Sequence, residues 1–389
     1  MTEGPLAGVR VVELASLGPG PFAAMMLADL GADVIRVDRL GAPSEQPERD
    51  VVLRNRRSIA VDLKSTAGRD VVLGLVAGAD AIVEGFRPGV AERLGLGPEQ
   101  CHARNPRLVY GRMTGWGQDG PLSASAGHDI TYLAVTGVLW GSRRVGERPV
   151  PSMNLLGDLG GGAAFLAFGI VSALLHARTT GEGQIVDASI VDGTAAMSNF
   201  IRGLREQGLW SGEPGTNLLD TGAPFYDTYV CSDGKEIAVG ALEPQFYAEL
   251  VRLTEAANPS LDPAQRGDPS TWPAARRDWA TLFATRTRDE WAALLEGTDA
   301  CAAPVLSWDE AAQHPHLVAR GTFVEVDGVV QAVPAPRFSG TPAVLSMPPM
   351  PPTPPTPPRR VGADTDELLA ELGRSAAEIA QLRGSGAVG

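Results

Sequence analysis

Three ionisable side chains in this 389-residue sequence stand at positions suited to proton transfer, and His128 is the first of them. It follows Gly127 and precedes an apolar run that reaches Trp140, so we expect it at the N-terminus of a helix. A neutral imidazole there can act as a base near neutral pH, while the adjacent backbone N–H groups can hold a developing oxyanion. A single histidine is also often structural, and the sequence leaves both interpretations open.

Asp158 and Glu243 are the two acidic candidates. Asp158 directly precedes the most apolar helical segment of the chain and the glycines 160–162. It is either an ordinary helix N-cap or a carboxylate held in a partly dry cleft, where its pKa would shift. Glu243 lies between a predicted strand and Pro244, in the first turn of a helix, where negative charge is favourable. This position alone is enough to explain a glutamate there.

The stretch VVELASLGPGPFA, residues 11–23, has the strand, the Gly-x-Gly-x-x-Ala loop and the following helix of a dinucleotide-binding unit. Such a site needs backbone N–H groups that point at a pyrophosphate. Pro19 and Pro21 each remove one of these donors, which weakens the loop as a phosphate site and leaves it a good strand-to-helix turn.

Basic residues gather near the expected carboxyl ends of the first strands, where open α/β sheets bind their ligands. This pattern is consistent with a multiply phosphorylated ligand, although the same arginines can instead pair with surface carboxylates such as Asp38. The residues in question are Arg36, Arg39, Arg54, Arg56, Arg57, Lys64, Arg87 and Arg93.

Composition excludes several classes of protein. A net charge of −13 argues against nonspecific nucleic-acid binding, because a polyanion would be repelled. The three cysteines, far apart and without metal-ligand spacing, predict neither a disulfide framework nor a metal site. With no export signal evident, we expect a cytoplasmic protein. The uncharged run Leu159–Leu175 is short for a membrane span and is expected to be a buried helix.

Short β-rich runs alternate with helical ones up to about Pro151, which predicts an α/β fold with an open parallel sheet. A hairpin with a Ser-Asp-Gly turn and three amphipathic helices follow, and predict a smaller α+β domain over residues 225–330. The expected strands of the sheet are Val9–Leu14, Asp33–Val37, Ser58–Asp62, Ala81–Glu84, Leu108–Met113 and Gln184–Ser189.

Together these segments resemble the family III CoA-transferase (CaiB/BaiF-type) superfamily, and within it the alpha-methylacyl-CoA racemases. The resemblance covers almost the whole chain and includes AGHDITY at residues 126–132, NLLGDLGGG at 154–162 and AVGALEPQFYAEL at 238–250. In that family the Rossmann-like N-terminal unit binds coenzyme A rather than a nicotinamide.

The resemblance implies an interlocked homodimer with each active site between the large domain of one chain and the small domain of the other. It divides the chain into a large CoA-binding domain (1–200), a linker (201–224), the small domain (225–330) and a return segment (331–389) that completes the large domain. By similarity, His128 and Asp158 are the acid/bases, Glu243 hydrogen-bonds His128, and the Asp129 N–H receives the thioester oxygen, with the Asp129 carboxylate in the same network. CoA contacts would fall to Arg39, Arg87 and Arg93, with Arg54, Arg57 and Lys64 as further candidates.

The implied reaction inverts the 2-methyl stereocentre of a branched acyl-CoA. It needs two groups, one on each face of the α-carbon, because a single group would only exchange the proton. No metal or redox cofactor is required, since coenzyme A is part of the substrate. The alternative is a CoA-transferase of the same fold, in which Asp158 attacks the thioester and becomes acylated. The glycine-rich loop of that type is not seen between residues 225 and 330.

Overall fold

The computed structural model describes residues 4–41, 49–341 and 355–389, which form two compact units. Unit 1 comprises Met1–Thr136, Ser152–Met197 and Pro315–Gly389, and unit 2 comprises Gly137–Pro151 and Ser198–His314. Compared with the predicted domain bounds, unit 2 therefore begins earlier, takes in residues 137–151 and ends before residues 315–330. The segment 137–151 joins unit 2 through an ion pair of 2.6 Å between Arg144 and Asp227.

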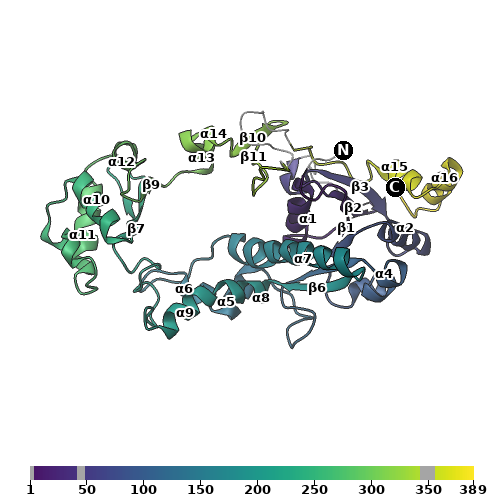
Figure 1. Ribbon diagram of the computed structural model, residues 1–389, viewed down its shortest axis with the longest axis horizontal. Helices are drawn as coiled ribbons and strands as arrows, with labels where there is room; N and C mark the ends of the chain where they lie inside the picture. Colours follow the sequence, from purple (N-terminus) through teal and green to yellow (C-terminus); the bar gives the residue numbers. More distant parts are fainter. Residues whose placement is uncertain (1–3, 42–48, 342–354) are drawn as a thin grey trace. The chain divides into compact units, whose positions relative to one another are not determined.

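A six-stranded parallel sheet forms the centre of unit 1 and confirms the α/β prediction. Its strand order is β3-β2-β1-β4-β5-β6, so the order reverses direction between β1 and β4 (Figure 1). Strands β1 to β5 are almost continuously buried runs, as expected of parallel strands covered on both faces. The strands are β1 (Arg10–Leu14), β2 (Asp33–Arg39), β3 (Arg56–Val61), β4 (Ala81–Glu84), β5 (Val109–Thr114) and β6 (Gln184–Ser189).

Helices cover both faces of this sheet. On one face α1 and α7 pack against residues such as Val11 and Val83, and on the other α2, α4 and α15 pack against residues such as Val12 and Tyr110. The helices of the N-terminal part of the unit are α1 (Pro19–Asp29), 3-10 helix η2 (Val51–Leu53), α2 (Thr66–Ala77), α3 (Val90–Arg93), α4 (Pro98–Arg104), α5 (Asp129–Thr136), α7 (Phe165–Thr180) and α8 (Ile190–Met197).

The apolar segment before β6 begins as a π-helix, η3 (Leu155–Ala164), and continues directly into α7. By length and composition alone Leu155–Thr180 could cross a membrane, a test that buried core helices also pass. Here it contacts α1, β5 and β6, and Figure 1 shows α7 running beside β6. The segment is therefore part of the core packing of unit 1, and its π-helical start is unusual enough to mark a functional position.

The C-terminal part of the chain returns to unit 1. Helix α15 packs on the sheet through Leu368 and Leu369, and an antiparallel bridge joins Val61 at the end of β3 to Val388. Figure 1 shows α15 and α16 in yellow on the side of the unit where β3 lies. The elements of this part are α14 (Pro315–Ala319), β10 (Phe323–Val326), β11 (Val329–Ala332), α15 (Thr365–Glu371) and α16 (Ala376–Gly384).

Unit 2 has its own small sheet and an aromatic core. The predicted hairpin is confirmed, because β7 pairs antiparallel with β8, and β9 pairs antiparallel with β8 on its other side. Trp279, Trp291 and Phe283 are fully buried against this sheet. The elements are α6 (Val138–Gly141), α9 (Asn199–Glu206), β7 (Tyr226–Val230), β8 (Glu236–Gly240), α10 (Pro244–Thr254), η4 (Pro259–Leu261), η5 (Pro263–Gln265), α11 (Trp272–Phe283), α12 (Arg288–Leu295), β9 (Ala302–Pro304) and α13 (Trp308–Gln313).

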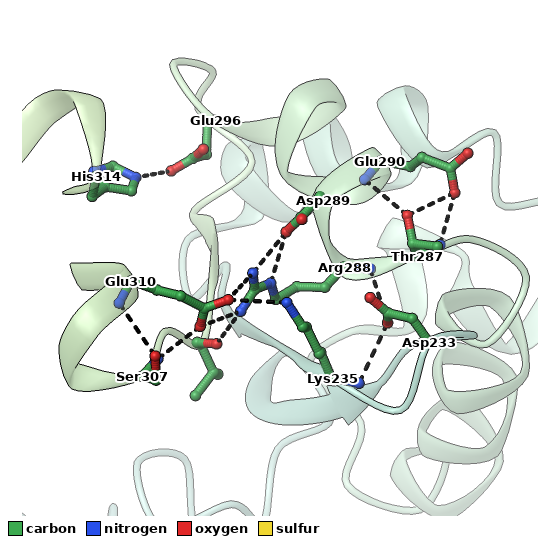
Figure 2. Close-up of polar contacts among 11 residues, drawn as sticks. Asp233, Lys235, Thr287, Arg288, Asp289, Glu290, Glu296, Ser307, Glu310 and His314 are labelled. Atoms are coloured by element: carbon green, nitrogen blue, oxygen red, sulfur yellow. Dashed lines mark hydrogen bonds and ion pairs between the residues drawn. The ribbon is translucent and has the colours of Figure 1, made fainter. Parts of the chain in front are cut away.

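A polar cluster around Arg288 holds α12, α13 and the β7–β8 turn together (Figure 2). The Arg288 guanidinium contacts Glu310 at 2.8 Å and donates to the Val305 carbonyl at 3.0 Å, and Lys235 from the turn reaches the same Glu310 at 2.9 Å. Hydrogen bonds from Arg288, and then from Ser307 and Lys235, hold the pKa of Glu310 well below its usual range. The cluster fixes the start of β8, the strand that precedes Glu243.

Candidate active site

The reversal of strand order between β1 and β4 creates a crevice at the carboxyl ends of the strands, the usual ligand site of open α/β sheets. A cavity of about 340 Å³ lies there. The loops that follow β1, β4 and β5 form its wall, and His128 and Asp158 both line it. The two predicted proton carriers, 30 residues apart in the chain, are thus brought to one cavity.

His128 directly precedes α5, which confirms its predicted place at a helix N-terminus. The His128 N–H donates to Thr131 Oγ1 at 3.1 Å, and Thr131 Oγ1 donates back to the His128 carbonyl at 2.7 Å. These two bonds fix the backbone at the start of the helix. Because the first N–H groups of a helix have no partner within it, the Asp129 N–H, the first of α5, has no acceptor in that helix.

Asp158 lies within the first turn of η3 rather than before it, so the N-cap interpretation is wrong; Asn154 occupies the N-cap position. The Asp158 carboxyl is half-buried, and burial raises its pKa. The negative charge of Asp129 raises this pKa further, while a hydrogen bond from Asn154 and the charge of His128 lower it.

The Asp129 side chain holds the backbone of Asp158. Its Oδ1 accepts a hydrogen bond of 2.8 Å from the Asp158 N–H, and the residue is 7% exposed. Gly157 permits this contact, because a Cβ at that position would lie 3.0 Å from Asp129 Cγ and would overlap Oδ1. Among the described residues, the other oxygen, Oδ2, has no hydrogen-bond partner. The carboxylate predicted to belong to the network therefore positions Asp158.

Glu243 is the N-cap residue of α10 in unit 2, where its side chain is exposed and makes no capping hydrogen bond. The predicted stabilisation of the helix N-terminus by the negative charge of Glu243 thus requires no hydrogen bond from its side chain. The predicted hydrogen bond to His128 stays a prediction.

Four of the predicted cationic residues are exposed near the carboxyl ends of the strands. Arg39 ends β2, Lys64 follows β3, Arg87 follows β4 and lines the cavity, and Arg93 ends α3. Because the strands are parallel, these ends lie along one edge of the sheet. A ligand with several phosphates would meet these cations along that edge.

The position of Arg54 in the structure contradicts its predicted role as a CoA contact. The residue is 4% exposed, and its guanidinium binds the Asp29 carboxylate in a bidentate pair. It also donates to Gln331 Oε1 at 2.9 Å and to the Ala332 carbonyl at 2.8 Å. The donors of Arg54 are therefore used to hold strand β11 in unit 1. Arg57 is similarly paired, with Asp33 and Glu371.

Sequence reasoning missed several residues of the cavity wall. They include Leu17, Phe86, Met113, Trp116, Tyr132 and Ile190. Only Tyr132 carried a usable signal: it lies four residues after His128, so its side chain leaves the first turn of the helix on the side of His128. Among the described residues, no group of three or more His, Cys, Asp or Glu side chains is arranged to hold a metal ion.

Comparisons with known proteins agree with this geometry. A model of CoA-transferase family III matches residues 6–365. An alpha-methylacyl-CoA racemase of Mus musculus is 46% identical over 379 residues, covering 97% of this chain and 96% of the relative, and one of Homo sapiens is 43% identical with the same coverage. The crystal structure of a CAIB/BAIF family protein from Brucella suis matches with a TM-score of 0.79 and 26% identity, over 95% of this chain and 100% of that one.

Proposed function

The chain belongs to CoA-transferase family III, and from this membership we propose that it is a racemase that inverts the 2-methyl stereocentre of branched-chain acyl-CoA thioesters. It is thus an isomerase. The observation that carries the proposal is the presence of His128 and Asp158 in the wall of one cavity. The racemases of mouse and man, which match over nearly their whole lengths, support it.

In the proposed reaction one of the two groups takes the proton from the α-carbon and the other returns a proton to the opposite face. The electron pair of the broken C–H bond moves onto the thioester oxygen, which forms an enolate. The Asp129 N–H at the start of α5 stabilises this oxygen between the two transfers. Both transfers move protons only, so the reaction as proposed needs no metal or redox cofactor.

A racemase runs in both directions, so its two bases need similar proton affinities. An aspartate in water is a far weaker base than an imidazole. Burial and the charge of Asp129 both raise the pKa of Asp158, which brings it closer to that of a histidine. This tuning serves a proton carrier, since it increases the basicity of the carboxylate and lets it hold a proton at higher pH.

The substrate would enter with its phosphates along the strand ends, where Arg39, Arg87 and Arg93 are exposed. Lys64 lies on the same edge and is proposed as a further contact. The acyl chain would extend from the cavity over apolar side chains such as Leu17, which is 93% exposed at its rim. A cytoplasmic location stays a prediction.

We also propose that the protein forms an interlocked homodimer. Helix α7 exposes Phe168 at 74% and Leu175 at 67%, and a second copy of the chain would cover such apolar side chains. In such a dimer, Glu243 of the partner subunit would face His128.

Co-expression of His128→Ala and Glu243→Ala chains tests this, because a mixed dimer has one intact site only if each site combines two chains. Absence of restored activity would contradict it.

Solvent deuterium incorporation tests the function itself. The enzyme should place deuterium at the α-carbon of a 2-methylacyl-CoA of either configuration and produce both epimers, without a second acid or a nicotinamide. His128→Ala or Asp158→Ala should reduce racemisation by about 10²- to 10⁴-fold, the usual contribution of a general acid or base. Transfer of CoA to an added acid without deuterium uptake would instead support the CoA-transferase alternative, with Asp158 as the nucleophile.

A further inference from the structure

Tyr132 is held rigidly in the wall of the cavity. It is 7% exposed, and its ring meets Trp116 edge-on, with ring centroids 4.7 Å apart. Two glycines make room for it, because a Cβ at Gly115 or Gly127 would collide with the phenol ring. A side chain fixed on this many sides has little freedom to reorient.

The hydroxyl of Tyr132 lies at the N-terminal end of α5. A Cβ at Gly127, the residue before His128, would be 2.9 Å from this oxygen. This direction follows from helix geometry, since long side chains on a helix lean back over the preceding turn. The phenol oxygen thus lies near the helix end from which the Asp129 N–H projects.

No hydrogen bond joins this hydroxyl to any residue that the structure describes, although the ring around it is almost fully buried. The residue lines the cavity, and its hydroxyl lies beside Gly115 and Gly127, which line the same cavity. Burial raises the pKa of Tyr132 and the nearby Asp158 carboxylate raises it further, so the group stays protonated at neutral pH and is available as a hydrogen-bond donor. A nearly buried donor without an acceptor among the described residues is available to bind a ligand.

We propose that Tyr132 is a catalytic residue whose O–H donates a second hydrogen bond, beside that of the Asp129 N–H, to the thioester oxygen of the substrate. This inference rests on the proposed racemase function. As the α-proton leaves, the electron pair moves to that oxygen, and both donors strengthen their bonds to the growing charge. The Tyr132 proton stays on the phenol throughout, and the electron pair returns to carbon when the second group delivers its proton.

The test compares wild type with Tyr132→Phe, which keeps the ring and its contact with Trp116. Deuterium uptake by wild type is measured first, so that a failure of the racemase proposal is seen separately. Loss of one oxyanion donor should reduce kcat by about 10²-fold. Two CoA ligands are then compared, a saturated thioester and the matching thioether, which lacks the carbonyl oxygen. The variant should bind the thioester less tightly and the thioether as wild type does.

Tyr110→Phe is the matched control. Tyr110 lies on β5 and is fully buried, and its hydroxyl donates to the Leu96 carbonyl at 2.8 Å, away from the cavity. This variant should lower the melting temperature and leave kcat unchanged. For Tyr132→Phe, a kcat within threefold of wild type would overturn the proposal. Equal weakening of thioester and thioether binding would also overturn it. A pH profile that shifts at unchanged maximal kcat would overturn it too, because it would show that Tyr132 donates its hydrogen bond to Asp158 instead.

Discussion

Replacing Gly157 by alanine tests whether Asp129 positions the proposed proton carrier. The new methyl group would overlap Asp129 Oδ1 and lie 3.0 Å from Cγ, so the carboxylate has to move by about 1 Å to reach an ordinary contact. That movement breaks the 2.8 Å bond from the Asp158 N–H. Losing a hydrogen bond to a charged acceptor costs about 1.5–3 kcal/mol of stability. Without that bond Asp158 would lose its position, and a 1 Å displacement of a reacting group reduces the rate by about 10²-fold.

The assay is kcat for deuterium incorporation into a 2-methylacyl-CoA, with urea unfolding measured in parallel. Gly160→Ala is the control, because it makes the same change in the same π-helix and its nearest contacts would be 3.3 Å from Leu155 O and 3.4 Å from Met197 Cε. We expect Gly157→Ala to lose about 10²-fold in kcat and Gly160→Ala to stay within about fivefold of wild type. Wild-type kcat in Gly157→Ala would refute the positioning role of Asp129.

Arg54→Met should lower the unfolding free energy by about 3–5 kcal/mol without changing KM, because it leaves the Asp29 carboxylate buried and largely unpaired. Arg57→Met, which removes a partly exposed pair, should cost about 1 kcal/mol or less, and a raised KM in the Arg54 variant would restore its CoA role. Asp129→Asn keeps an oxygen for the Asp158 N–H but removes the charge that raises the pKa of Asp158, so the limb of the pH–kcat profile that reports this group should move to lower pH; an unmoved limb contradicts the tuning. Arg87→Gln should raise KM for the acyl-CoA several-fold with little effect on kcat, and a loss confined to kcat would exclude a phosphate contact.

The parallel sheet was predictable because its strands carry a local signal. All six strands lie within two residues of the predicted bounds at each end, and β4 and β6 have the predicted bounds, since Val and Ile runs flanked by glycines and polar residues mark buried strands. β3 begins at Arg56, two residues earlier than expected. A buried arginine is indistinguishable in sequence from an exposed one, because its burial depends on a distant partner, here Glu13 at 2.6 Å.

The candidate site also contains features that the local sequence predicts and features that it does not. The helix start after His128 could be predicted from local sequence, whereas the contact between Asp129 and Asp158 spans 29 residues and depends on the order of the strands. Residue type alone also failed to predict the role of Arg54, because its guanidinium forms an ion pair with Asp29 and both side chains are buried. Long-range pairing of charges is set by tertiary packing, so no local pattern contains it.

The crevice after β1 shows how a Rossmann-like unit can lack a pyrophosphate site. Helix α1 starts at Pro19 after Gly18, whose φ of 73° requires glycine. The first intrahelical bond runs from the Phe22 N–H to the Gly18 carbonyl, and of the four N–H groups before it those of residues 19 and 21 are absent because both are prolines. A Cβ at Gly18 would lie 3.8 Å from the Asp158 carboxylate, so a pyrophosphate there would meet at most two amides and a negative charge. The loop that holds phosphate in dinucleotide enzymes therefore forms one wall of the proposed proton-transfer site, and we expect the phosphates to bind the arginines along the strand ends.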